Sequence, residues 1–73
     1  MNLIVKYISP LKVEIWVAPM TLEGLRDHHV GAIQSWVELA ELGYRTAYNQ
    51  WRLADESAMS AFVLYWHGKQ VDE

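Results

Sequence analysis

The segment that decides the fold is residues 3–17, which read LIVKYISPLKVEIWV. Odd positions from Leu3 to Tyr7 lie on one side of an extended chain, and residues 12–17 alternate in the same way. A period of two is typical of a strand with one buried face. Pro10 separates the two runs and suits the second position of a tight turn. The segment therefore predicts an antiparallel hairpin.

An amphipathic helix is predicted to follow the hairpin. Thr21 can cap this helix and Glu23 falls in its first turn. Placed at about 100° per residue, the apolar side collects Leu22, Leu25, His29, Ile33, Trp36, Val37 and Ala40. The opposite side carries an acidic stripe, which comprises Glu23, Asp27, Gln34, Glu38 and Glu41. Gly43 stands where a helix prefers a left-handed terminating residue.

Residues 44–53 fit two patterns. Tyr44, Thr46 and Tyr48 alternate like a strand, and Tyr, Thr and Trp favour strands. A helical stripe would instead consist of Tyr44, Ala47, Tyr48, Trp51 and Ala54. We predict the strand, because a two-stranded hairpin is marginally stable in water and a third strand would support it.

A last helix is predicted after Asp55, which can cap it, with Glu56 in the first turn. Four side chains at helical spacing would face inward: Ala58, Met59, Phe62 and Trp66. The alternative is a strand over residues 62–66, because that run is apolar on every side. The predicted fold is thus one α+β domain over residues 1–73, a small antiparallel sheet with helices on one face in the order ββαβα, with ββαα as the alternative.

The strand at residues 44–53 leaves one face of the sheet uncovered. The covered face would carry Leu3, Val5, Val13, Ile15, Ala47, Trp51 and Leu53. The open face would carry Ile4, Lys6, Lys12, Glu14, Trp16, Tyr44, Tyr48 and Arg52. Its aromatic and cationic members are the candidate binding residues: Trp16, Tyr44, Tyr48, Arg52, Lys6 and Lys12. They indicate a protein interface, a base-stacking platform or an ordinary half-solvated sheet.

Composition narrows the function classes. The chain of 73 residues has four Trp, four Tyr and one Phe, and a domain this small cannot bury all of these rings. Exposed Trp and Tyr are typical anchors of protein contacts. The net charge is −3 and the Lys and Arg residues are scattered, so we do not expect direct nucleic-acid binding or a membrane partner. The apolar run at the start is broken by Lys6, which predicts an intact cytoplasmic protein without a signal peptide.

Candidate catalytic and metal-binding residues do not form a recognisable arrangement. The chain has no Cys, which excludes disulfides and thiolate chemistry. His28 and His29 are adjacent, so on a helix they point about 100° apart, and His67 is distant in sequence. The serines lack a nucleophile-elbow context, and the glycines form no phosphate-binding loop. We therefore expect no enzyme activity, no metal and no cofactor.

Residues 51–66, WRLADESAMSAFVLYW, carry a resemblance to a class of known proteins. A strand ends, an acidic residue caps a short helix, and Phe-x-Leu-x-Trp closes it. This resembles a pattern in the compact, Trp-rich proteins that lytic bacteriophages make to seize host machinery. The resemblance implies binding to a host protein complex in the bacterial cytoplasm. RNA polymerase is the favoured partner, with inhibition of host promoters and readthrough of terminators as the outcome.

Two other functions stay open. One is a phage inhibitor of a host defence complex, such as an anti-CRISPR protein. It would use the acidic residues Glu23, Asp27, Glu38 and Glu41 to mimic nucleic acid. The other is a single-stranded RNA-binding domain that uses Trp16, Tyr44 and Tyr48 on the open sheet face.

Overall fold

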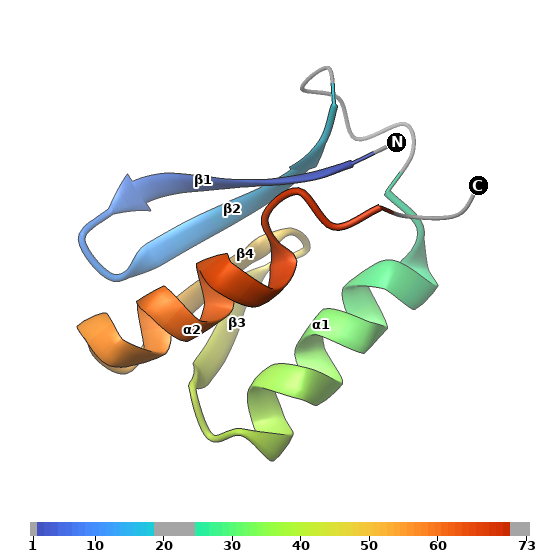
Figure 1. Ribbon diagram of the computed structural model, residues 1–73. Coiled ribbons are helices and arrows are strands. Elements are labelled where there is room, and N and C mark those ends of the chain that lie inside the picture. The colour runs from blue at the N-terminus through green and yellow to red at the C-terminus, as the bar shows by residue number, and fades with distance from the viewer. Residues whose placement is uncertain (1, 19–24, 71–73) are drawn as a thin grey trace.

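The computed structural model describes residues 2–18 and 25–70 as an α+β fold (Figure 1). The elements are β1 (Leu3–Ser9), β2 (Lys12–Val17), α1 (Asp27–Leu39), β3 (Gly43–Ala47), β4 (Gln50–Leu53) and α2 (Glu56–Trp66). The four strands form one antiparallel sheet in the order β1-β2-β4-β3. Both helices lie against one face of this sheet. The predicted fold class is therefore confirmed. Among the described residues, no helix is both long and apolar enough to span a bilayer.

The first hairpin has the register that its alternation predicts. Leu3 lies opposite Val17, and Val5 lies opposite Ile15, so buried side chains face one another across β1 and β2. The register shifts between Tyr7 and Ser9, immediately before the turn that contains Pro10. Direct cross-strand partners share a face, so this pairing sets both the buried face and the open face of the sheet.

The second half of the sheet is a second hairpin rather than one strand. β3 and β4 are joined by Tyr48 and Asn49, and β4 lies between β3 and β2. The prediction of extended structure at residues 44–53 is confirmed, but the prediction of a single strand is wrong. The turn lacks the Asn-Gly or Asp-Gly pair that marks most two-residue hairpins, so the local sequence does not reveal it. Ala47, predicted to be covered by the helices, is exposed beside a second register shift.

The core lies between the sheet and the two helices. The strands bury Leu3, Val5, Val13, Ile15, Val17, Trp51 and Leu53. The helices bury Val30, Ile33, Val37, Ala58, Met59, Phe62 and Trp66. Trp51 is 0% exposed, and its ring centroid lies 6.2 Å from that of Phe62. Its indole N–H donates to Gln34 Oε1 at 2.8 Å, as a buried indole requires.

The α2 helix follows its prediction closely. Asp55 is the N-cap residue, and its carboxylate accepts a hydrogen bond from the Ala58 N–H at 2.8 Å. The four side chains predicted to face inward are the buried ones. The alternative of a strand over residues 62–66 is wrong, because the cap and the helical spacing act together.

The α1 helix differs from its prediction in start and in rotation. It begins at Asp27 after an extended Arg26, whereas the predicted cap Thr21, with Leu22 and Glu23, lies outside the described residues. The buried line is Val30, Ile33 and Val37, while Trp36 is half-buried at one flank. The rotation places Gln34 beside the Trp51 indole. Because Trp51 belongs to β4, the sequence of the helix alone does not predict this rotation.

The left-handed residue that ends α1 is not the predicted glycine. Glu41, not Gly43, is left-handed, with φ 54°. The Leu42 N–H donates to the Val37 carbonyl at 3.0 Å, and the Glu41 N–H donates to the Glu38 carbonyl at 3.1 Å. This pair of bonds is a Schellman motif, in which glycine is the usual left-handed residue.

Gly43 serves a different purpose as the first residue of β3. A Cβ atom at this position would overlap the Arg52 carbonyl oxygen and would lie 2.9 Å from the Leu53 Cα. The close approach of β3 to β4 therefore requires glycine here. At Gly31, on the exposed side of α1, a Cβ would meet nothing within 4 Å.

We expect Gly43→Ala and Gly31→Ala to change stability in opposite directions. The first substitution forces two backbones apart and should cost more than about 4 kcal/mol, which is close to the whole stability of a domain this small. The second should stabilise the protein by about 0.5–1 kcal/mol, because alanine favours a helix interior over glycine. Urea unfolding followed by circular dichroism measures both. A folded, unchanged Gly43→Ala protein would contradict the pairing of β3 with β4.

Glu41→Gly should raise the free energy of unfolding by about 0.5–1 kcal/mol, because it removes the cost of a left-handed side-chain-bearing residue. The matched control is Glu38→Gly, which makes the same substitution in the right-handed body of α1. That variant should lose about 1 kcal/mol. Equal losses in both variants would show that Glu41 is not left-handed in solution.

Candidate binding surface

The open face of the sheet brings cations and aromatic rings together in cross-strand rows. Lys12 lies opposite Arg52, and Arg52 lies opposite Tyr44, so one row crosses β2, β4 and β3. Arg52 is exposed, and Tyr44 is 59% exposed. The three side chains share a face that the helices do not cover. Five of the six predicted binding residues therefore lie on this face: Lys6, Lys12, Trp16, Tyr44 and Arg52.

Trp16 is held on this face by a hydrogen-bonded carboxylate. Its indole N–H donates to Glu14 Oε1 at 2.6 Å, and the Gln50 side-chain amide donates to Glu14 Oε2 at 2.8 Å. Glu14 lies opposite Lys6 on β1 and Gln50 on β4. The Trp16 ring is half-buried. This network restricts the ring before any partner arrives.

Positive charge is concentrated on the open face. It carries Lys6, Lys12 and Arg52, which are three of the six Lys and Arg residues of the chain. It carries Glu14, which is one of the nine Asp and Glu residues. The carboxylate of Glu14 is already occupied by two donors. This surface is therefore positive on a chain whose net charge is −3.

Tyr48 does not belong to the open face, and its predicted position there is wrong. It lies in the turn between β3 and β4, where strand alternation stops. Its hydroxyl donates to Asp27 Oδ1 at 2.7 Å, which ties the hairpin to the start of α1. The Arg45 guanidinium carbon lies 5.4 Å from the Tyr48 ring centroid.

The predicted acidic surface is only partly assembled. Asp27 and Glu38 belong to α1, Glu41 follows it in the left-handed position, and Glu23 lies outside the described residues. Asp27 binds the Tyr48 hydroxyl, and Glu38 Oε1 accepts from the Gln34 amide at 2.6 Å. Asp27 thus lies on the flank of α1 that adjoins the second hairpin. The exposed residues opposite the buried line include no acid and are instead His28, Gly31, Ala32, Ser35 and Leu39.

An aromatic cluster between the helices was not predicted. Trp36 of α1 stacks on Tyr65 of α2, with centroids 4.8 Å apart and an interplanar angle of 19°. Trp66 lies perpendicular to Trp36, at 5.8 Å, and the Lys69 ammonium lies 4.4 Å from the Tyr65 centroid. Among the described residues, the buried Trp66 indole nitrogen has no hydrogen-bond acceptor.

His29 and His67 accept backbone hydrogen bonds. The Arg26 N–H donates to His29 Nδ1 at 3.2 Å, and the Val5 N–H donates to His67 Nδ1 at 3.0 Å. The rings of His28 and His29 lie 4.0 Å apart. Over residues 2–18 and 25–70, no cluster of three potential metal ligands occurs.

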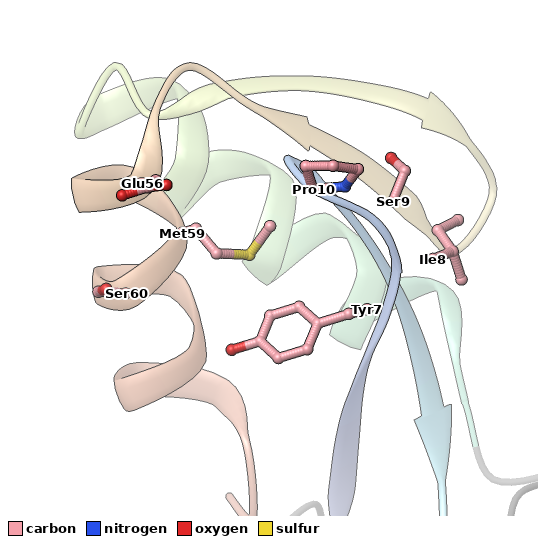
Figure 2. Close-up of a pocket in the computed structure, with 7 residues that line it drawn as sticks. All are labelled: Tyr7, Ile8, Ser9, Pro10, Glu56, Met59 and Ser60. Atoms are coloured by element: carbon pink, nitrogen blue, oxygen red, sulfur yellow. The ribbon is translucent and has the colours of Figure 1, made fainter.

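A shallow groove of about 600 Å³ lies outside the open face, between the β1–β2 turn and α2 (Figure 2). Sequence alternation had placed Tyr7 on the covered side of β1, but its side chain is 61% exposed along this groove. The lining residues are Tyr7, Ile8, Ser9, Pro10, Glu56, Met59 and Ser60. No sequence motif marks them, because they come from two distant segments.

The hydrogen bond between Tyr48 and Asp27 gives a pH-dependent prediction. Accepting this bond, Asp27 raises the pKa of Tyr48 above its ordinary value of 10.0, and desolvation and the Asp27 charge act in the same direction. The folded protein thus holds this proton more tightly than the unfolded chain does. Its contribution to stability should be complete below pH 10 and should disappear as the pH rises through the folded-state pKa. In an ultraviolet titration of tyrosinate, Asp27→Ala should lower the highest tyrosine pKa, and the control Glu38→Ala should leave it unchanged.

No protein-family model, curated protein or solved structure matches this chain.

Proposed function

We propose that this protein is a non-catalytic protein-binding module whose contact surface is the open face of the sheet. The partner we favour is a host bacterial RNA polymerase, with transcription shut-off and antitermination as the consequence. The choice of partner comes from the resemblance of residues 51–66 to phage host-takeover proteins. The choice of the open face as the contact surface comes from the arrangement of its side chains.

The observation that carries the proposal is the grouping of Trp16, Tyr44 and Arg52 on one uncovered surface. Trp, Tyr and Arg are the residue types that dominate binding energy at protein interfaces. Glu14 restrains the Trp16 ring, so less side-chain entropy would be lost on binding. A ring that is restrained on an uncovered sheet face is suited to act as an anchor.

Cations around this anchor support a partner with an acidic docking surface. Lys6, Lys12 and Arg52 would orient the approach of such a surface, because complementary charge mainly raises the association rate and selects the register. The rest of the chain is negative and would repel the same surface. Charge segregation thus favours binding through one face.

Single-stranded RNA is the second candidate ligand, because Lys12 and Arg52 share a cross-strand row with Tyr44 on the face that also carries Lys6 and Trp16. Bases stack on aromatic side chains while cations follow the backbone. Nucleic-acid mimicry by the acids of α1 has less support, since Asp27 and Glu38 are already hydrogen-bonded within the protein.

The test is affinity capture from a nuclease-treated bacterial lysate, followed by titration of the purified partner. RNA polymerase subunits should be enriched by the wild type. Trp16→Ala should lose about 2 kcal/mol of binding energy, which is roughly thirtyfold in affinity. Leu39→Ala is the control, because Leu39 is 88% exposed on α1, away from the sheet. Circular dichroism checks that each variant is folded.

Salt dependence separates the candidates. Protein binding anchored by Trp16 should weaken only modestly as salt rises. RNA binding should fall steeply with salt and should disappear when Lys6, Lys12 and Arg52 are all replaced by Gln. Loss of binding only when Asp27, Glu38 and Glu41 are neutralised would reject the open face and favour nucleic-acid mimicry.

A further inference from the structure

The outer edge of β1 is paired along its first half by residues that follow α2. The Leu3 N–H donates to the Lys69 carbonyl at 2.8 Å, and the Gly68 N–H donates to the Leu3 carbonyl at 2.8 Å. Asn2 and Gln70 form an antiparallel bridge. His67 closes the paired stretch by accepting the Val5 N–H. The chain itself thus uses this edge to add extended backbone.

The next outward-facing position on this edge is Tyr7. Backbone groups of a strand point to alternate sides at successive residues. Leu3 and Val5 direct their backbone N–H groups away from β2. Because the register is regular up to Tyr7, the backbone groups of Tyr7 also point away from β2. The residues after α2 run from Val5 towards Asn2, away from Tyr7. An extended segment from another molecule can therefore continue the pairing at Tyr7.

The groove in Figure 2 adjoins this part of the edge. The Tyr7 ring points from β1 towards α2, and Met59 lies beside it, whereas Ile8 and Ser9 point away. Glu56 and Ser60, one helical turn apart on α2, also line the groove. Of the seven described residues that line the groove, only Glu56 carries a charge. The groove thus combines an exposed aromatic face, an apolar floor and one carboxylate.

We propose that the edge of β1 at Tyr7 binds an extended peptide segment of a partner protein and that the groove receives a Lys or Arg side chain from that segment. A residue directly opposite Tyr7 has its side chain on the same face as Tyr7, so that side chain enters the groove. An aliphatic stem can lie along Met59, and the cationic head can reach the Tyr7 ring and Glu56. This is strand addition with one side-chain pocket. It is a second binding surface, separate from the open face.

The probe is the pentapeptide acetyl-Thr-Val-Arg-Val-Thr-amide, titrated into the isotope-labelled full chain and followed by backbone amide NMR. Shifts should concentrate at Tyr7, Ile8, Glu56 and Ser60. Replacing the central Arg by Glu should weaken binding at least about tenfold, which corresponds to the loss of one charge-assisted contact. N-methylation of the central Arg should weaken it similarly, because the strand-pairing donor is removed.

Variants of the protein locate the contact. Glu56→Gln should weaken binding of the Arg peptide, and Glu56→Lys should restore binding of the Glu peptide by reversing the charge. Glu41→Gln is the matched control, since Glu41 is an exposed acid that does not line the groove, and it should have no effect. The absence of shifts, equal binding of the Arg and Glu peptides, or shifts confined to Trp16 and Tyr44 would each overturn the proposal. Trp16→Ala should leave this peptide's affinity unchanged, so failure here and failure of the open-face proposal are distinguishable.

Discussion

The burial of the Trp51 indole positions everything else in this domain. Trp51 lies on β4, an inner strand, where its ring approaches Phe62 of α2 and its N–H binds Gln34 of α1. Leaving that N–H without an acceptor would cost about 1–3 kcal/mol, so α1 must present Gln34 to the core. Removing the ring would cost about 3–5 kcal/mol, which is the scale of the total stability of so small a domain. One side chain therefore positions both helices.

Both helices pack over Trp51 on one face of the sheet. The rest of the protein surface therefore divides into distinct regions. The open face keeps Trp16 in place through Glu14 and Gln50 and concentrates half of the Lys and Arg residues. The flank of α1 keeps its acids tied to neighbouring side chains. The edge of β1 beside α2 exposes Tyr7 above a groove. The two proposed binding surfaces thus follow from where the helices stop covering the sheet.

Several elements could be predicted from neighbouring residues alone. The first hairpin follows from alternation around Pro10, and α2 follows from the Asp55 cap and the spacing of its apolar residues. The open face was largely predictable for the same reason, because alternation in β1 and β2 decides which side chains share a face. The rotation of α1 was not predictable, since Val30 lies in the buried line while Trp36 is half-buried at its flank, and this rotation brings Gln34 to Trp51.

Local periodicity and capping act over a few residues. They predict the fold class, the first hairpin, α2 and the position of Lys6, Lys12 and Arg52 on one face of the sheet. The remaining features depend on residues far apart in the chain. Tyr48 does not lie on the open face, because its hydroxyl donates a hydrogen bond to Asp27, 21 positions away in the sequence. Glycine is required at position 43 because the Arg52 carbonyl approaches it. Tyr7 borders a groove because Met59 and Glu56 of α2, about 50 positions away in the sequence, line its other side. Such contacts exist only after the sheet and helices have packed, so no local pattern encodes them.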